Sequence, residues 1–372
     1  MQTLERLDSN QEASWYRLVG DWQGRVERYV VSTPWSRQIC NQPEVLGVDY
    51  TSGLCNAMGA ALRNAPFAPS IRNHPEHKVC VVNFLRGGLN FDLRRALHDS
   101  YGFNRHSSAF MSSQRKRVEG RWYVQENMYR KLDIPKDAIL LMGDVVATGV
   151  TMDNGLQVIS EHVWNIGSSL RSVVFFTIGC HKSEKILEAM DTRLRQHFPQ
   201  YESTILVYLE AKFRLVDSKT ELRIAIPGTD LIRKNALLAP EFEASQYDAL
   251  AWPLERCAIY DAGSRAFDIP TYVDDVAEYW NETLHFAKEG LTLAEVLQER
   301  WPEEGRESRD AFLEARRARW PGQPEAFLDD LYARSQARWK DNARLATATA
   351  LTQLCEERLA TFRSLAGDPR GE

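Results

Sequence analysis

The residues with the clearest potential for chemistry lie at the end of one apolar run, between Ile139 and Thr151. A buried strand that passes through small and hydroxyl-bearing residues into a helix presents backbone N–H groups, and such groups bind a phosphate monoester. Gly149 lets the backbone close around the anion. Thr148 and Thr151 add hydroxyl donors. The carboxylate of Asp144 can accept hydrogen bonds from sugar hydroxyls or hold a water of Mg²⁺.

The same residues, taken alone, also fit an ordinary strand-to-helix turn in which Asp144 and Thr148 cap a helix that begins near Met152. An upstream segment favours a binding site. There a predicted strand, 79–84, is followed by Arg86, Gly87 and Gly88. Glycines permit a tight loop whose N–H groups face pyrophosphate, although a simple turn is the alternative for this loop by itself.

The elements that must position these loops are short β-branched runs between about residues 78 and 262, separated by helical segments. Strands buried on both faces of a parallel sheet are continuously apolar, so this alternation predicts an α/β fold. The predicted strands are Val79–Phe84, Ala138–Met142, Val173–Ile178 and Thr204–Leu209. Before them we expect a peripheral strand at Val30 and an amphipathic helix through Met58.

After about residue 272 the strand pattern ends and Ala, Leu, Glu and Arg dominate. We therefore predict an α/β domain over residues 1–271 and a helical C-terminal extension over residues 272–372. Thr292 and Glu295 form a predicted capping box. The apolar side chains of this extension are expected to pack on the core or on a second subunit.

Composition excludes several classes of protein. The formal net charge is −5 and the isoelectric point is about 6.0, so the positive field that nonspecific nucleic-acid binding needs is missing. Six widely spaced cysteines without a CxxC pair indicate buried thiols in a reducing compartment. The start has no apolar signal segment, and no run of eighteen apolar residues occurs. We expect a cytoplasmic protein with no nucleic-acid or membrane partner, acting as a homo-oligomer.

The segment 139–151 resembles the loop of type I phosphoribosyltransferases that binds phosphoribosyl pyrophosphate, PRPP. In this chain Gly143 stands where the first of two acids is common in that family. The segment 85–89 resembles the pyrophosphate loop of that family, and its sequence is close to the one found in uracil phosphoribosyltransferases. The resemblance covers about residues 25 to 270. It implies a parallel-sheet phosphoribosyltransferase-like core, Mg²⁺ as cofactor, and PRPP and a base as substrates.

A third motif, Arg256–Phe267, resembles a motif near the carboxyl end of the uracil enzymes. Here Ser264 replaces its second Asp, and Tyr260 replaces a glycine that lets uracil meet bare backbone. The polar, basic segment 105–130 stands where that family has a mobile hood. Arg115, Lys116 and Arg117 within it could neutralise pyrophosphate, and a solvated surface hairpin is the alternative.

The resemblance implies catalytic roles for Arg86, Asp144 and Asp261, with the two acids also facing the metal. It implies substrate contacts for Gly87, Gly88, Arg115, Val146, Ala147, Thr148, Gly149, Val150, Thr151 and Tyr260. The predicted activity is transfer of phosphoribosyl from PRPP to a nitrogenous base. The alternatives are a non-catalytic PRPP or nucleotide sensor, a related hydrolase, or a specialised-pathway transferase that makes a carbon-linked nucleotide.

Three histidines are weaker candidates. His181, followed by Lys182, comes directly after a predicted strand and could line an acceptor pocket, although a lone histidine there is more often structural. His74 and His77 lack a third histidine or a cysteine nearby, which argues against zinc.

Overall fold

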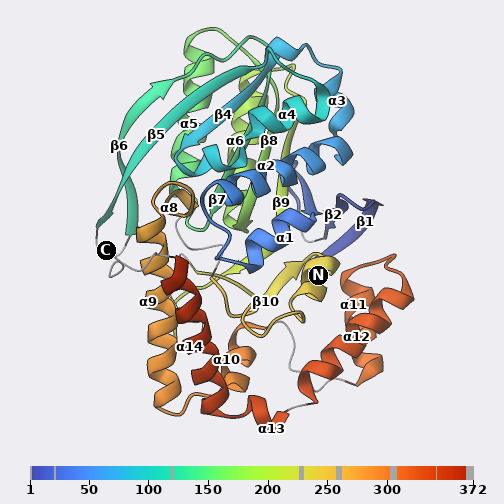
Figure 1. Ribbon diagram of the computed structural model, residues 1–372. Coiled ribbons are helices and arrows are strands. Elements are labelled where there is room, and N and C mark those ends of the chain that lie inside the picture. Colours follow the sequence, from blue (N-terminus) through green and yellow to red (C-terminus); the bar gives the residue numbers. More distant parts are fainter. Residues whose placement is uncertain are drawn as a thin grey trace.

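The computed structural model shows a central sheet covered by helices (Figure 1). It describes residues 2–20, 22–118, 121–225, 230–256, 262–301, 308–340 and 342–365, without the side chains of 8, 9, 113–118, 121–128, 342 and 343. The strands in these ranges are β1 (Thr3–Ser9), β2 (Ser14–Val19), β3 (Glu27–Ser32), β4 (Val79–Leu85), β5 (Ser107–Val118), β6 (Arg121–Lys131), β7 (Ala138–Val146), β8 (Leu170–Cys180), β9 (Ser203–Leu215) and β10 (Leu231–Leu238).

The strand order is β1-β2-β3-β9-β8-β7-β4-β5-β6, and β10 also pairs with β9. Neighbouring strands from β3 through β5 in this order pair in parallel, whereas β1, β2, β6 and β10 pair antiparallel. The predicted mixed α/β fold with a mostly parallel sheet is therefore confirmed. The expectation that the strand at Val30 is peripheral is wrong, because β3 lies between β2 and β9.

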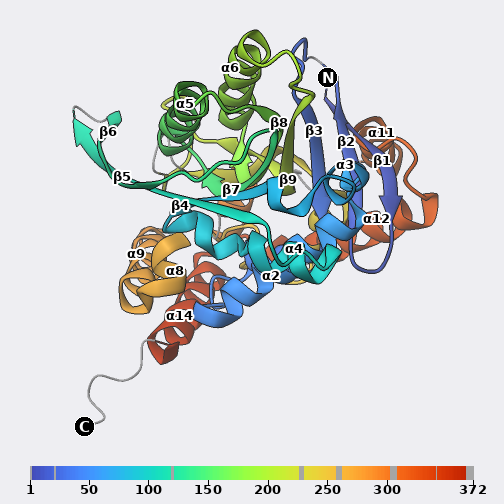
Figure 2. The ribbon, with the colours of Figure 1, turned by 90° about the horizontal axis from the view of Figure 1, so that it is seen from above.

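Helices cover both faces of the sheet (Figure 2). One face carries α5 (Val150–Asn165) and α6 (Lys182–His197). The other carries α2 (Gly47–Asn64) and α4 (Leu93–Tyr101). Shorter elements are α1 (Pro34–Asn41), α3 (Ala68–Arg72) and two 3-10 helices, η1 (Glu76–Lys78) and η2 (Gly87–Phe91).

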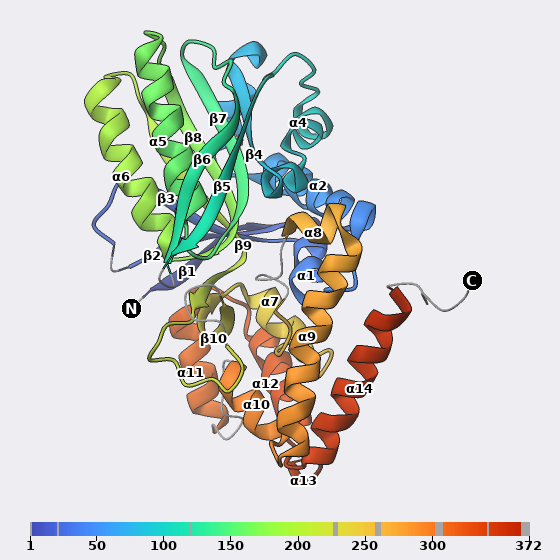
Figure 3. The ribbon, with the colours of Figure 1, turned by 90° about the vertical axis from the view of Figure 1, so that its left-hand side faces the viewer.

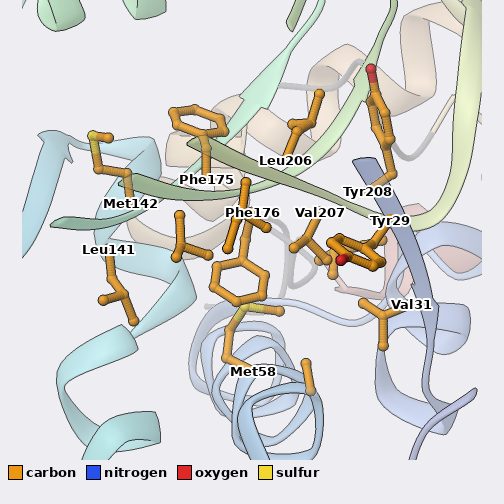
Figure 4. Close-up of a cluster of buried hydrophobic side chains, with 14 of the residues drawn as sticks. Tyr29, Val31, Met58, Leu141, Met142, Phe175, Phe176, Leu206, Val207 and Tyr208 are labelled. Atoms are coloured by element: carbon orange, nitrogen blue, oxygen red, sulfur yellow. The ribbon is translucent and has the colours of Figure 1, made fainter. Parts of the chain in front are cut away.

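Burial on both faces explains the continuous apolar strands. Phe175 and Phe176 are adjacent on β8 and fully buried, yet they point to opposite faces of the sheet, and Phe176 points toward Met58 of α2 (Figure 4). Period-two alternation thus places apolar side chains in both helical layers at once.

The remaining helices lie mostly at one end of the sheet (Figure 3). They are α7 (Pro240–Ser245), α8 (Ala262–Phe267), α9 (Ile269–Lys288), α10 (Leu293–Arg300), α11 (Arg309–Arg319), α12 (Glu325–Trp339), α13 (Asn342–Leu345) and α14 (Ala348–Leu365). The predicted capping box of Thr292 and Glu295 is present at the start of α10.

Two hydrophobic clusters divide these helices. Side chains of α9, α10 and α14 form a cluster with residues of the 224–254 segment. In contrast, α11 and α12 contribute to the core of the sheet, where Trp320 is fully buried and its indole N–H donates to the Leu238 carbonyl at 3.0 Å. The division at residues 271 and 272 remains a prediction.

Several further expectations can be compared with the described residues. Cys40, Cys55, Cys80, Cys180 and Cys355 are buried thiols outside any disulfide. Within the described ranges, none of the helices is both long and apolar enough to cross a membrane. The segment 105–130 largely forms the β5–β6 hairpin, and β5 buries Ala109 and Met111 against the sheet.

The path of the chain fixes where a ligand can bind. After β4 the chain turns to β5 on one side, and it later returns to place β7 on the other side of β4. Ligands of open α/β sheets bind at such a reversal, outside the carboxyl ends of the strands. The loops after β4 and β7 are the two predicted binding loops.

A fully buried glutamate on β9 ties β3 and α1 to the sheet. The Glu210 carboxylate accepts from the Ser32 hydroxyl at 2.6 Å, from the Thr33 amide at 2.9 Å, and from the Ser36 hydroxyl. Burial raises the pKa of Glu210 to about 7, although these hydrogen bonds and the charge of Arg37 oppose the shift.

We predict that Glu210→Gln flattens the dependence of stability on pH. The folded chain keeps the Glu210 proton up to about pH 7, whereas the unfolded chain loses it near the ordinary value of 4.5. The folded state binds more protons between these values, so the free energy of unfolding falls as pH rises through this window and then levels off. Urea denaturation between pH 4 and about pH 8 measures the slope, with exposed Glu314→Gln as control. An unchanged slope in the variant would contradict the assignment.

Candidate functional site

Two loops meet at the carboxyl ends of β4 and β7. The backbone of Gly87 approaches Asp144 so closely that a Cβ added at Gly87 would lie 2.8 Å from the Asp144 Oδ1. At Gly88 an added Cβ would lie 3.0 Å from the Gly143 carbonyl oxygen. The structure therefore brings Gly87, Gly88 and Asp144 together, and a side chain at Gly88 would press against the backbone of Gly143.

The loop after β7 leads directly into a helix. Val146 ends the strand and is buried, and Ala147 and Thr148 form the turn. Gly149 has a φ of +79°, and a Cβ there would lie 2.4 Å from the Ile186 side chain. The positive φ strongly favours glycine at this position, and any larger residue would also have to displace the end of the Ile186 side chain.

The helix α5 begins at Val150, two residues earlier than expected. Gly149 supplies no capping side chain, and the first-turn amides of a helix have no partner within the helix itself. Thr148 Oγ1 accepts only a long hydrogen bond, 3.5 Å, from the Val150 amide. Thr151 lies half-buried in the first turn. This arrangement suits an anion at the helix start.

The charged residues of the two loops differ in exposure. Asp144 is half-buried, and its Oδ1 accepts from the Val145 amide at 2.8 Å. Arg86 is exposed at the start of η2, and the Leu85–Arg86 peptide bond is cis. The carboxylate is thus held in place while the guanidinium reaches solvent.

The surroundings of Gly143 leave no room for a side chain at that position. A Cβ there would lie 2.5 Å from Cγ of Phe91, whose side chain is completely buried. The aromatic ring occupies the space that any side chain at position 143 needs. Only Asp144 can present a carboxylate from the end of this strand.

Three residues beside these loops were missed from the sequence. Asn90 Nδ2 donates to the Ala262 carbonyl at 2.7 Å, which joins η2 to α8. The guanidinium of Arg265 lies 4.5 Å from the ring centre of Tyr50. Burial raises the pKa of Tyr50 to about 12, against the effects of Arg265 and a hydrogen bond with Asn90. The sequence gives no direct signal for this group, because Tyr50 has the spacing of a core residue on α2.

The start of α6, with Lys182, lies next to the loop after β7. The Lys182 Cβ lies 3.7 Å from the position of a Cβ on Gly149, and the Cys180 thiol donates to the Ala147 carbonyl at 3.4 Å. The pKa of His181 is lowered by burial and by neighbouring lysines such as Lys182. His181 therefore lies near this loop, in a cationic environment.

Some predicted site residues cannot be compared with the structure. Tyr260 and Asp261 lie outside the described residues. Arg115, Lys116 and Arg117 are on β5, paired with β6, but their side chains also lie outside the described set. In the described ranges, no group of three or more His, Cys, Asp or Glu side chains could hold a metal. His74 instead bonds the Asp137 carbonyl at 2.9 Å.

No protein-family model matches the sequence, and no curated protein matches it either. Solved structures show a distant likeness. The AQ2163 protein from Aquifex aeolicus is 16% identical with a TM-score of 0.34, over 50% of this chain and 89% of that chain.

Two phosphoribosyltransferase structures are similarly distant. Adenine phosphoribosyltransferase from Trypanosoma brucei, in complex with AMP, pyrophosphate and ribose-5-phosphate, is 13% identical with a TM-score of 0.31, over 49% of this chain and 83% of that chain. Purine phosphoribosyltransferase from Pyrococcus horikoshii is 15% identical with a TM-score of 0.25, over 46% and 92%. At these values the likeness identifies no ligand and no reaction.

We predict that Gly143→Ala destabilises the fold by about 1–3 kcal/mol, because its Cβ would overlap the Phe91 ring. The double variant Gly143→Ala, Phe91→Leu should lose less stability than the two single variants together. Thermal denaturation of the four proteins gives the coupling. A Gly143→Ala protein as stable as the parent would show that Phe91 does not fill this space.

Proposed function

We propose that this chain transfers the phosphoribosyl group of PRPP to a nitrogenous base and releases pyrophosphate. The observation that carries the proposal is the meeting of Gly87 and Asp144 beside the start of α5. A glycine-rich loop follows β4, and a carboxylate and a helix start without a side-chain cap follow its neighbour β7. These are the groups needed by pyrophosphate, ribose hydroxyls and the 5-phosphate, in that order.

Each loop has a distinct role in this proposal. Backbone amides from Ala147 to Thr151 bind the 5-phosphate, and Asp144 accepts hydrogen bonds from the ribose hydroxyls. Gly87 and Gly88 bring backbone close to pyrophosphate, while the exposed Arg86 neutralises it.

The reaction breaks the bond between the anomeric carbon and a pyrophosphate oxygen. A bond to the acceptor nitrogen forms, and that nitrogen loses its proton. Because positive charge develops on the ribose and negative charge on pyrophosphate, positioning and charge neutralisation supply most of the catalysis. In this proposal Asp144 acts on the ribose side and Arg86 on the pyrophosphate side.

The described residues fit a Mg²⁺ ion that arrives with the substrate. Mg²⁺ keeps several waters and commonly uses one or two carboxylates plus phosphate oxygens. Asp144 is the carboxylate at this place, and Asp261 is the second one predicted from the sequence. When bound, Mg²⁺ would neutralise charge on the leaving pyrophosphate.

A non-catalytic PRPP or nucleotide sensor is the second candidate. The observation that favours it is the Phe91 ring under Gly143, because it leaves the strand with one acid instead of two. The identity of the acceptor, uracil-like or other, is part of the proposal, as are a homo-oligomeric state and a cytoplasmic location.

One assay separates these functions. The protein is incubated with Mg²⁺, PRPP and a panel of bases, and pyrophosphate release is measured. Release that requires one base supports transfer, and analysis of the product distinguishes a nitrogen-linked from a carbon-linked nucleotide. Release without any base indicates a hydrolase, and calorimetric binding without release indicates a sensor.

We predict that Asp144→Asn weakens PRPP binding or turnover at least about tenfold, roughly 1.4 kcal/mol, because a neutral amide replaces the carboxylate that accepts the ribose hydroxyls. The matched control is Asp99→Asn, at a partly exposed position on α4 paired with Arg95. Titration calorimetry with PRPP and the pyrophosphate assay are both run on each variant. Equal values for the parent and Asp144→Asn would remove Asp144 from the site.

A further inference from the structure

Three arginines, of which Arg233 and Arg265 are buried and Arg358 is 12% exposed, converge on one short segment, residues 39–45, at the end of α1. Arg233 comes from β10, Arg265 from α8 and Arg358 from α14. The acceptors are the carbonyls of Cys40 at 2.8 Å (Arg233), of Ile39 at 3.1 Å, Gln42 at 2.6 Å and Val45 at 2.8 Å (all Arg265), and the Glu44 carboxylate at 2.8 Å (Arg358). A helix C-terminus favours cations, so the segment is a natural anchor. We call the three residues the arginine clamp.

The same arginines fix both ends of the stretch that precedes and contains α8. On the early side, Arg233 Nη1 donates to the Glu255 carbonyl at 2.8 Å, and Arg358 Nη2 lies 2.7 Å from the Glu255 carboxylate. On the late side, Arg265 is itself part of α8. Glu255 and Arg265 are therefore both attached to segment 39–45, although ten positions separate them in the sequence.

The C-terminal helices complete this attachment. The indole N–H of Trp280 on α9 donates to the Glu255 carboxylate at 3.3 Å, and the Tyr279 hydroxyl donates to the Leu254 carbonyl at 2.9 Å. The Glu255 carboxylate is fully buried, and the side chain of Arg358, its ion-pair partner, is 12% exposed. Removing one partner from such a buried ion pair leaves a charge without compensation, which costs far more than the loss of a surface pair.

The clamp also reaches the candidate site. The Ala262 carbonyl of α8 accepts from Asn90 of η2, and η2 begins at Gly87, the residue that faces Asp144. Hydrogen bonds and ion pairs thus run without a gap from α14, through segment 39–45 and α8, to the loop after β4.

We propose that the C-terminal helices act as a positioning frame for the acceptor side of the site, with Arg358 as the positioning residue that links α14 to both Glu255 and Glu44. Arg358 touches no substrate. It fixes the early flank of the sequence motif predicted to contact the acceptor base, and thereby sets acceptor affinity. The kinetic part of this inference rests on the proposed transfer reaction, whereas the positioning part does not.

The test uses the full-length chain with Arg358→Met, which keeps an apolar stem but removes the guanidinium. Arg363→Met, at an exposed position on the same helix, is the matched control. Arg358→Lys should restore part of the effect through Glu255 alone, because an ammonium lacks the planar fork that reaches two carboxylates. Glu44→Gln, at a half-buried position, removes only the link to segment 39–45 and keeps the test available if Arg358→Met does not fold.

The first measurement is amide hydrogen exchange, which needs no activity. Exchange in residues 254–268 should become about tenfold faster in Arg358→Met and less so in Glu44→Gln, whereas exchange in residues 138–151 should stay within about twofold of the parent. Unchanged exchange in residues 254–268, or an equal rise throughout the chain, would overturn the inference.

The second measurement is kinetic. With the acceptor found in the base panel, kcat/KM for the base should fall about tenfold in Arg358→Met while the Kd for PRPP changes less than about threefold. An equal loss for both substrates, or none, would overturn the kinetic part. If the parent protein shows no transfer at all, the proposed function fails, and the exchange experiment still decides whether Arg358 positions this region.

Discussion

The close approach of the loop after β4 to the end of β7 is the contact on which the site depends. Gly87 lies directly against the Asp144 carboxylate, and the absence of a side chain at Gly88 lets its backbone approach the Gly143 carbonyl. Parallel pairing of β4 with β7 brings their carboxyl ends to one edge, and the strand order reverses between them, which is where open α/β sheets bind ligands. As a result, the start of α5, the Asp144 carboxylate and the loop of Gly87 and Gly88 all lie at this edge of the sheet.

Much of the sheet was predictable because its central strands are buried on both sides and read as continuous apolar runs. The strands β1, β2 and β10 were missed. β1 and β2 lie at an edge and carry exposed polar residues such as Glu5 and Arg17, so their pattern is weak. The central position of β3 was also hidden, since its parallel partner β9 is far away in the sequence and no local pattern encodes that pairing.

In the candidate site, too, some residues could be predicted from the sequence and others could not. The two loops are contiguous segments, so glycines, hydroxyls and an acid could be recognised from their order. The residues around the loops could not, because Tyr50, Asn90 and Arg265 come from three separate elements and meet only in the fold. The reason for glycine at position 143 could likewise not be predicted from the sequence. The structure shows that the Phe91 ring fills the space that a side chain there would need.

The burial of Trp320 among residues of the sheet has a consequence for how the chain is made. Helices α11 and α12 complete the core next to β10, yet they follow β1–β10 in the sequence and are therefore synthesised after them. Until α11 and α12 have been synthesised, the apolar surface that they cover stays exposed on the earlier strands. Exposed apolar surface of this kind is prone to aggregation. A delay between the synthesis of β10 and the synthesis of α12 would therefore lengthen the time during which this apolar surface is exposed.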